Sequence, residues 1–371
     1  MPISDDHRRL TVLKSFGNNP GSLRARTHIP ESFPKNGPLV VVLHGSTQSA
    51  ESYNSGSGWS TLADECGVAL LFPEQRRTNN ALRSFNWFKP RDSRRGGGEP
   101  LSIRQMIGQV VDDHEGDPSR VFITGLSSGG AMTSVMLATY PEVFAGGAIV
   151  AGLPYRSAGT VKQAIHRMKG HGGPSDRKLD ALVRGASSFT GRWPTISVWH
   201  GGSDRTVASS NAGSIVRQWQ RIHRVEGPPT RIEQVDGFPR RVWCDASGRE
   251  VIEEYIIGGM GHGTPIRARG EEGLGEEGKY MLEVGISSTR HIARFWGLTQ
   301  RRSDVPAEGA AYKSGDRGSD LDRTANPPSA TVDGAIGGRS NILKRLRRLF
   351  PFRSPRMGFG KHKSASDDGR R

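Results

Sequence analysis

The sequence predicts an α/β fold with a mostly parallel central sheet flanked by helices. Between about residues 10 and 297, short apolar runs alternate with stretches of helical periodicity, the pattern that gives parallel sheets covered on both faces. The apolar runs are continuous rather than alternating, as expected of strands buried on both sides. The length of 371 residues allows one such unit with extensions.

The elements follow one another in a regular order. Six apolar runs are predicted as buried strands: 39–43, 68–72, 121–124, 148–151, 195–199 and 251–257. An antiparallel pair is predicted before them, at 10–16 and 23–29. Helices are predicted between and after the strands, at 102–114, 129–140, 211–224 and 287–296.

The chain divides into a main domain and extensions. We expect an N-terminal arm at 1–9 and the α/β domain at 10–297. Within that domain, residues 154–192 interrupt the alternation and are rich in Gly, Ser and basic residues. This segment is either a cap over a pocket or a mobile surface insertion. Residues 298–338 are predicted as a disordered linker, and 339–371 as a basic tail.

Positive charge is concentrated in the tail. Residues 339–371 hold 11 Lys or Arg and 2 Asp or Glu, so they carry +9 of the net charge of +15 and leave +6 for the rest. A short amphipathic helix is predicted at 341–350, with apolar positions at Ile342, Leu343, Leu346, Leu349 and Phe350. The tail is interpreted as binding an anionic lipid or storage-granule surface, or as a solvated tail without a partner.

The sequence favours a cytoplasmic protein. No run of about 18 apolar residues occurs, and the first residues lack the basic-then-apolar order of a secretory signal. The two cysteines, Cys66 and Cys244, form no disulfide framework and are expected to be half-buried thiols.

Ser127 is predicted to be a nucleophile. It lies in GLSSG between an apolar strand and a helix-forming stretch, which is the pattern of a nucleophile elbow. A chance match is easy in a chain with 49 glycines, so the strand-to-helix context carries the prediction. The helix N-terminus favours the negative charge that develops there.

Asp204 and His262 are predicted to complete a catalytic triad. A serine needs a histidine to take its proton, and the histidine needs a carboxylate to hold its tautomer. Asp204 follows the strand TISVWHG, and His262 lies in the glycine-rich loop GGMGHG after a later strand. Alone, each residue has an ordinary explanation, Asp204 as a turn or cap and His262 as a structural histidine. The order Ser, Asp, His makes the three a joint prediction of an α/β-hydrolase.

Two backbone amides are predicted to form an oxyanion hole. The residue after the nucleophile, Ser128, supplies one, and Ser46, in the HGSTQ turn after an early strand, supplies the other. The alternative is that this turn merely ends the strand.

The chain resembles the polyhydroxybutyrate depolymerase family of esterases, which is related to feruloyl and acetylxylan esterases. The resemblance covers about residues 16–297 and rests on these blocks, in order: LVVVLHGSTQSAESY, LADECGVALLFPEQ, FNWFKP, GLSSGGAMTSVMLATYPEVFAGGAIVAGLPY, WHGGSDRTV and GMGHGTP. It implies an α/β-hydrolase fold, the triad Ser127, Asp204 and His262, and the Ser46 amide in the oxyanion hole.

Departures from the family pattern bear on compartment and substrate. The family often has cysteines where Ser46 and Ser84 stand, and the resemblance implies a disulfide there in secreted members, which are common in the family. Losing both agrees with a reducing compartment. GHGTP replaces the usual GHAWP, so a tryptophan beside His262 is missing. Trp87 in FNWF is interpreted as either a wall of the substrate pocket or core.

These residues predict a serine hydrolase that cleaves carboxylic esters through an acyl-enzyme. The resemblance implies 3-hydroxyalkanoate esters as its substrates, with feruloyl or acetylated sugar esters as the alternative. HExxH and GxxxxGK[ST] are absent, so no metal or nucleotide site is predicted, and the reaction needs no cofactor. A hypothesis of another class is a binding scaffold that acts through its basic tail on a membrane or nucleic acid. The predicted triad argues against it, and no nucleic-acid partner is expected.

Overall fold

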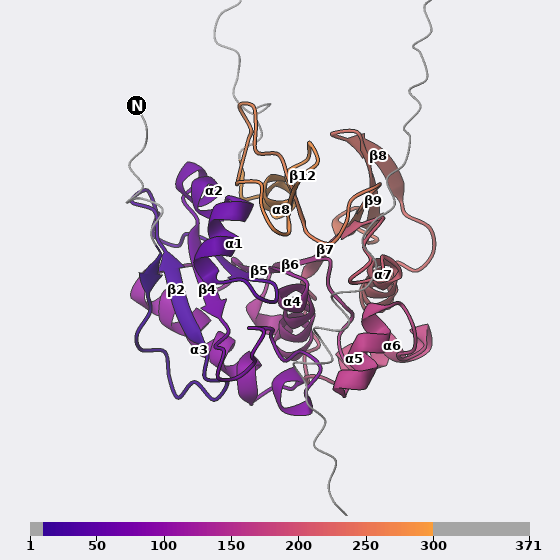
Figure 1. Cartoon of the computed structure of the whole chain (residues 1–371), viewed down its shortest axis with the longest axis horizontal. Helices are drawn as coiled ribbons and strands as arrows, with labels where there is room; N and C mark the ends of the chain where they lie inside the picture. Colours follow the sequence, from indigo (N-terminus) through magenta and orange to yellow (C-terminus); the bar gives the residue numbers. More distant parts are fainter. Residues whose placement is uncertain (1–9, 300–371) are drawn as a thin grey trace, which may run out of the picture. The chain divides into compact units, whose positions relative to one another are not determined.

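The computed structural model describes residues 10–299, and a ten-stranded mixed sheet lies at their centre (Figure 1). Its strands are β1 (Thr11–Val12), β2 (Arg24–His28), β3 (Leu39–Leu43), β4 (Ala69–Glu74), β5 (Val121–Leu126), β6 (Gly146–Val150), β7 (Thr195–Gly201), β8 (Arg231–Val235), β9 (Phe238–Cys244) and β10 (Glu250–Ile257). A separate pair consists of β11 (Thr264–Ile266) and β12 (Met281–Glu283).

The helices of the same residues lie between the strands in the sequence. They are α1 (Ala50–Ser57), α2 (Trp59–Cys66), α3 (Gly98–Asp113), α4 (Ser128–Thr139), α5 (Val161–Met168), α6 (Asp176–Arg184), α7 (Ser210–His223) and α8 (Ser288–Phe295), with short 3-10 helices at η2 (Pro90–Ser93) and η3 (Pro141–Val143).

The sheet has a parallel centre and antiparallel edges. The strand order is β1-β2-β4-β3-β5-β6-β7-β10-β9-β8, and neighbours from β4 to β10 pair in parallel. The strands β1 and β2 at one edge, and β9 and β8 at the other, pair antiparallel. The carboxyl ends of the parallel strands therefore share one edge, where open α/β sheets build their sites.

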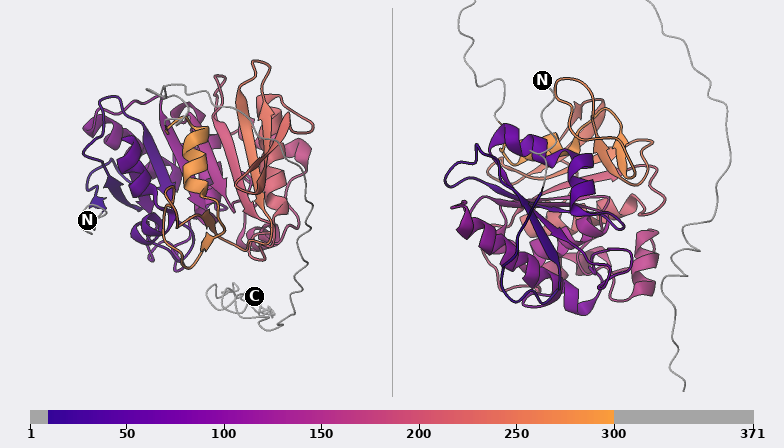
Figure 2. Two further views of the ribbon diagram at one scale, coloured as in Figure 1. Left: turned by 90° about the horizontal axis from the view of Figure 1, so that it is seen from above. Right: turned by 60° about the vertical axis from the view of Figure 1, so that its left-hand side comes forward.

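Two hydrophobic layers cover the sheet, with α3, α4 and α7 on one face and α1, α2 and α8 on the other (Figure 2). The strand β3 shows why the apolar runs are continuous. Val41 packs in the first layer, whereas Val40 and Val42 pack in the second, and all three are at most 1% exposed. A strand with core on both faces needs apolar side chains at every position.

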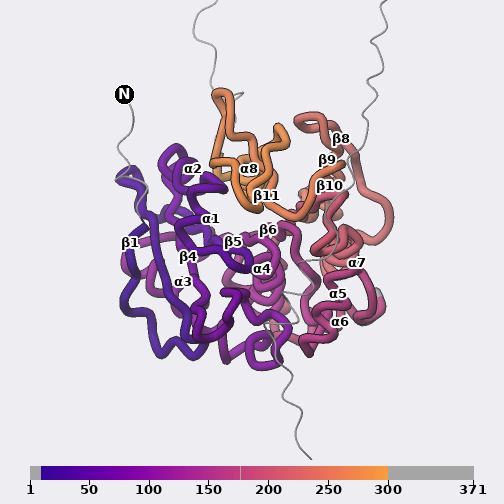
Figure 3. Tube along the Cα trace, in the orientation of Figure 1, coloured from indigo at the N-terminus to yellow at the C-terminus, as the bar shows by residue number. Residues whose placement is uncertain are grey.

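The insertion at 154–192 folds into α5 and α6, which lie beside α7 (Figure 3). Leu179 and Val183 of α6 are fully buried, and Gln218 of α7 donates from Nε2 to the Leu179 carbonyl at 2.9 Å. The weak helical pattern predicted around 179–183 is confirmed as α6, while α5 was not predicted.

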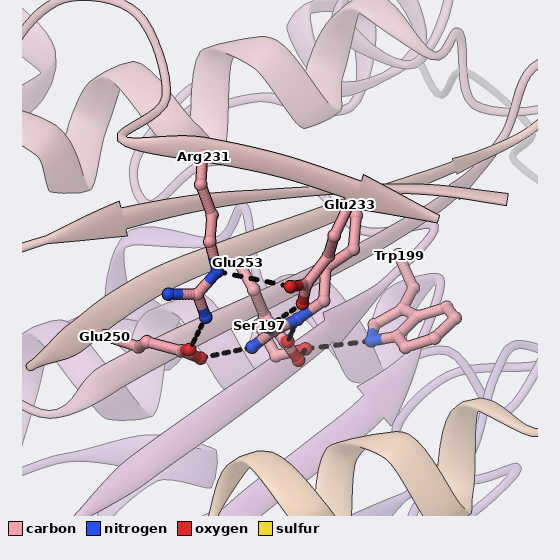
Figure 4. Close-up of polar contacts among 7 residues, drawn as sticks. Ser197, Trp199, Arg231, Glu233, Glu250 and Glu253 are labelled. Atoms are coloured by element: carbon pink, nitrogen blue, oxygen red, sulfur yellow. Dashed lines mark hydrogen bonds and ion pairs between the residues drawn. The ribbon is translucent and has the colours of Figure 1, made fainter. Parts of the chain in front are cut away.

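The β8–β9 hairpin is held to the sheet by an ion-pair cluster (Figure 4). Arg240 of β9 contacts the carboxylates of Glu233, Glu250 and Glu253. Glu253 of β10 is 1% exposed, and the Ser197 hydroxyl of β7 donates to it at 2.7 Å. This cluster ties β7, β10 and the hairpin together, and β7 and β10 are the strands that lead to Asp204 and His262.

The predicted fold class is confirmed. All six predicted buried strands occur within two residues of their predicted starts, and the early antiparallel pair is β1 and β2. The four predicted helices are α3, α4, α7 and α8. The helices α1, α2 and α5 and the strands β8, β9, β11 and β12 were missed. The predicted linker at 298–338 lies outside the described residues except for its first two positions. The tail at 339–371, with its predicted helix, lies wholly outside them.

The arm at 1–9 also lies outside them. Within residues 10–299, no helix is long and apolar enough to cross a lipid bilayer.

Candidate active site

Ser127 lies at a sharp turn between β5 and α4. Its backbone has φ 57° and ψ −112°, and its amide donates to the Val150 carbonyl of β6 at 2.8 Å. The turn leaves no space for side chains on its flanks. A Cβ on Gly129 would lie 2.3 Å from the Leu43 carbonyl oxygen, and one on Gly125 would lie 2.5 Å from the backbone of Gly129. Close packing therefore requires glycine two residues before and after Ser127, as the sequence predicted.

The structure brings Ser127, His262 and Asp204 together in one hydrogen-bonded chain. His262 Nε2 lies 2.9 Å from Ser127 Oγ, and His262 Nδ1 lies 2.6 Å from Asp204 Oδ2. With Asp204 accepting from Nδ1–H, Nε2 is free to accept the serine proton. The arrangement can perform general-base activation of a hydroxyl.

Asp204 is held as a carboxylate by several donors. Its Oδ1 accepts the amides of Thr206 and Val207 at 2.8 and 2.9 Å. Burial opposes its ionisation, but hydrogen bonds from His200 and His262 and the Val207 amide hold the pKa of Asp204 well below its usual range. Asp204 is therefore ionised near pH 7 and can stabilise the imidazolium form of His262.

His200 was missed by the sequence analysis. It is fully buried at the end of β7, and its Nε2 lies 3.4 Å from Asp204 Oδ2 and 2.9 Å from the Val207 carbonyl. The available signal was its position four residues before Asp204 in WHGGSD, at the end of a predicted strand.

The two predicted oxyanion residues face each other. Ser46 Oγ lies 3.2 Å from Ser128 Oγ. Within residues 10–299, neither backbone amide donates a hydrogen bond, so both N–H groups are available to an oxyanion. Ser128 also begins α4, where the helix dipole favours negative charge.

A buried network fixes the loop that carries Ser46. His44 Nε2 accepts the Gln75 amide at 3.1 Å, so Nδ1 carries the proton and donates to the Gly45 carbonyl at 2.8 Å. Burial lowers the pKa of His44 to about 4, in agreement with a neutral ring. The Gln75 side chain in turn donates to Glu99 at 2.6 Å.

Glu99 joins this network to the FNWF block. Its carboxyl accepts the Asn86 amide at 2.9 Å and the Asn86 side chain at 2.6 Å, and it is 1% exposed. Burial raises the pKa of Glu99 to about 8. The sequence analysis missed this residue because nothing distinguishes it locally from a solvated glutamate.

Two aromatic residues have different surroundings. Trp87 is 4% exposed and packs edge-on against Phe88 in the core. This agrees with the interpretation of Trp87 as a core residue, and its role as a wall of the substrate pocket stays a prediction. Tyr280, which was not predicted, stacks edge-on against His262 with ring centroids 6.0 Å apart. The backbone φ of Tyr280, 68°, is rare for a bulky residue. An aromatic ring thus lies beside His262 even though GHGTP lacks the tryptophan of the family pattern.

No group of three or more His, Cys, Asp or Glu within residues 10–299 could hold a metal ion. The chemistry described above uses only side chains and backbone amides of the chain.

The profile of the family described as Esterase PHB depolymerase matches residues 28–227, more than half of the chain. The chain belongs to this family. Poly(3-hydroxyalkanoate) depolymerase C of Paucimonas lemoignei is 43% identical over 291 residues, which cover 78% of this chain and 70% of the relative. The resemblance noted from the sequence is therefore confirmed, and this member of the family is a carboxylic-ester hydrolase.

Other relatives are named as feruloyl and acetylxylan esterases. Feruloyl esterase B of Talaromyces funiculosus is 29% identical over 265 residues, covering 69% of this chain and 73% of the relative. The structure of an acetyl xylan esterase from Aspergillus awamori matches with a TM-score of 0.66 at 21% identity, over 78% of this chain and all of that one. This structural likeness shows a shared α/β-hydrolase fold.

Proposed function

We propose that this esterase cleaves 3-hydroxyalkanoate esters through an acyl-enzyme on Ser127. The observation that carries the proposal is the hydrogen-bonded chain from Asp204 through His262 to Ser127, with distances of 2.6 and 2.9 Å. The roles of these residues follow from their chemistry.

The reaction proceeds in two halves. His262 Nε2 takes the proton of Ser127 as Oγ attacks the ester carbonyl, and the amides of Ser46 and Ser128 stabilise the oxyanion. His262 then gives the proton to the leaving alkoxide. Water, activated by the same imidazole, releases the acid from Ser127. Asp204 orients the ring and stabilises its cation throughout.

The substrate class is supported by the relative with 43% identity, whose name gives poly(3-hydroxyalkanoate) as its substrate. Feruloyl or acetylated sugar esters are the second candidate, supported by the names of relatives at 29% identity. The higher identity of the first relative favours the polyester or its oligomers.

The test is turnover of p-nitrophenyl butyrate, 3-hydroxybutyrate oligomers, a feruloyl ester and acetylated xylan by wild type and Ser127→Ala. We expect Ser127→Ala to lose about 10³-fold or more in kcat on every substrate that the wild type cleaves. The control is Ser188→Ala, an exposed serine of the insertion, with wild-type turnover. Equal activity of Ser127→Ala and wild type would contradict the acyl-enzyme. A higher kcat/KM on the sugar esters would select the second candidate.

We infer a reducing compartment, the cytoplasm, from the serines at positions 46 and 84. Both described cysteines, Cys66 and Cys244, are free thiols. Fractionation of the source cells, followed by an immunoblot, tests this, and recovery in the periplasm or the medium would contradict it.

The basic tail is proposed to bind an anionic surface through the apolar side of its predicted helix, at Ile342, Leu346 and Phe350. Deletion after Thr299 should keep turnover of p-nitrophenyl butyrate and abolish co-sedimentation with anionic vesicles and polyester granules. Unchanged co-sedimentation would rule the proposal out.

A further inference from the structure

A cavity of about 640 Å³ lies in the insertion between β6 and β7. Two cationic side chains, Arg156 and Lys162, and two histidines, His166 and His171, line it, and its lining includes no carboxylate. All four are exposed. The cavity is therefore a positively charged, solvent-accessible space that favours an anion.

The charge of the described domain is concentrated in this insertion. Residues 154–192 contain eight Lys or Arg and two Asp, a net charge of +6. The tail at 339–371 carries +9 of the total of +15, so the remaining residues of the chain sum to zero. Since the rest is balanced, the excess charge at the insertion distinguishes this surface from the remainder of the domain.

The wall of the cavity offers further donors. Thr160, the N-cap of α5, and Lys162 and Gln163 of its first turn form part of it, and a helix N-terminus carries partial positive charge. Ser157 also lines the cavity. Its side chain is 3% exposed, and its hydroxyl has no hydrogen-bond partner among residues 10–299.

The insertion contacts the loops of the candidate site where it starts and again at the end of α5. It follows β6, whose Val150 carbonyl accepts the Ser127 amide at 2.8 Å. At the end of α5, the Met168 carbonyl accepts the Ala208 amide at 2.7 Å, and Lys169 donates to the Arg205 carbonyl beside Asp204. The insertion therefore starts at the edge of the sheet where β6 and β7 end, and the end of α5 contacts the loop that carries Asp204.

We propose that this cavity binds the carboxylate end of a 3-hydroxyalkanoate oligomer. The inference rests on the proposed function and specifies which part of the substrate is recognised. When Ser127 Oγ forms its bond to the acyl carbon, the ester C–O bond breaks and the leaving oxygen takes the proton from His262. The fragment on that leaving oxygen carries the free carboxylate of the chain. The cavity thus holds the leaving fragment, and free 3-hydroxyalkanoate is its smallest ligand.

The kinetic test compares a 3-hydroxybutyrate trimer with the same trimer whose terminal carboxylate is a primary amide. Wild type should show a KM about 5-fold or more lower for the acid. Lys162→Gln should remove this difference by raising the KM of the acid, and leave the amide and p-nitrophenyl butyrate unchanged. The matched control is Lys178→Gln, an exposed lysine of α6 outside the cavity, which loses the same charge and should behave as wild type.

Two outcomes would overturn the proposal: equal KM values of the acid and the amide with wild type, or equal shifts in the Lys162→Gln and Lys178→Gln variants. The second would show a long-range effect of net charge rather than a site.

A binding measurement separates failure of this site from failure of the proposed function. Calorimetric titration of Ser127→Ala with 3-hydroxybutyrate and with its primary amide needs no turnover. The cavity is supported if 3-hydroxybutyrate binds and its amide does not, and if the double variant Ser127→Ala, Lys162→Gln no longer binds 3-hydroxybutyrate. This holds even if no oligomer is cleaved. Absence of anion binding at millimolar concentrations overturns the cavity even if oligomers are cleaved. The trimer acid, titrated alongside, shows whether the chain end or the free product binds more tightly.

Discussion

The backbone of Ser127 lies at φ 57° and ψ −112°, where a residue with a Cβ is strained. Neighbouring contacts maintain this conformation, because the Ser127 amide bonds to Val150 and α4 starts at the next residue. In this conformation Ser127 Oγ lies 2.9 Å from His262 Nε2, within the distance that general-base activation requires. The position proposed for the nucleophile is thus obtained at a cost in stability.

Removal of the Cβ should recover part of that stability. We expect Ser127→Gly to be more stable than Ser127→Ala by about 1 kcal/mol, since relieved strain exceeds the larger entropy of glycine in the unfolded chain. Urea unfolding of both variants measures the difference. Both variants lack the proposed nucleophile Ser127 Oγ, so a difference in activity does not affect the comparison. A glycine variant less stable than the alanine variant would show that the turn is unstrained.

Whether the sequence revealed a residue of the site depended on its local surroundings. Ser127 and His262 are flanked by glycines after apolar strands, so their setting could be recognised in the sequence. Glu99 could not be predicted to be buried, because a polar side chain carries no local sign of the partners that fold over it. For His200 the only signal was its position after a predicted strand. Their contacts come from segments distant in sequence or from a turn whose shape the sequence leaves open.

Among the elements, the parallel strands were predictable and the hairpin β8–β9 was not. The strand β3 is apolar at every position because core lies on both faces. In β9, Arg240 points to a buried glutamate, and in β8 Ile232 is 60% exposed, so neither strand shows the expected alternation of apolar and polar residues. The helix α5 has apolar residues at helical spacing, but it was missed because it is only eight residues long and lies between glycine-containing segments.

The hairpin depends on Arg240. The Arg240→Ala variant leaves Glu253, which is 1% exposed, without its cation. Burial then favours a protonated Glu253, so we expect the loss of the charged hydrogen bonds of Arg240, about 1.5 to 3 kcal/mol in the free energy of unfolding. The control is Arg231→Ala in the same cluster, whose side chain is 46% exposed and should cost about 1 kcal/mol or less. Equal losses, measured by urea unfolding, would contradict the assignment of Glu253 as the decisive partner.

At the scale of the whole molecule, buried carboxyl groups make stability depend on pH. Burial raises the pKa of Glu99 to about 8 and that of Glu253 to about 7, against 4.5 for an ordinary glutamate. Between 4.5 and these values the folded protein binds protons that the unfolded chain does not. Stability therefore falls as pH rises through this window.

We expect the free energy of unfolding to fall by roughly 1 to 2 kcal/mol from pH 6.5 to 8. This window avoids the opposite effect of His44 and His223, whose burial lowers their pKa to about 4 and reduces stability as pH falls below 6.5. In the Glu99→Gln variant the free energy of unfolding should depend less on pH in this window. In Glu115→Gln, which changes an exposed glutamate, the pH dependence should equal that of wild type. A free energy of unfolding that rises with pH in wild type would contradict the raised pKa values of Glu99 and Glu253.

The triad joins residues that are far apart along the chain: 135 positions separate Ser127 from His262, and 58 separate Asp204 from His262. Each residue follows a different strand, so the three meet only after β5, β7 and β10 have taken their places. Helices made of local contacts form sooner than such long-range pairings. During refolding, recovered esterase turnover would therefore report completion of the sheet, later than the rise of helical circular dichroism.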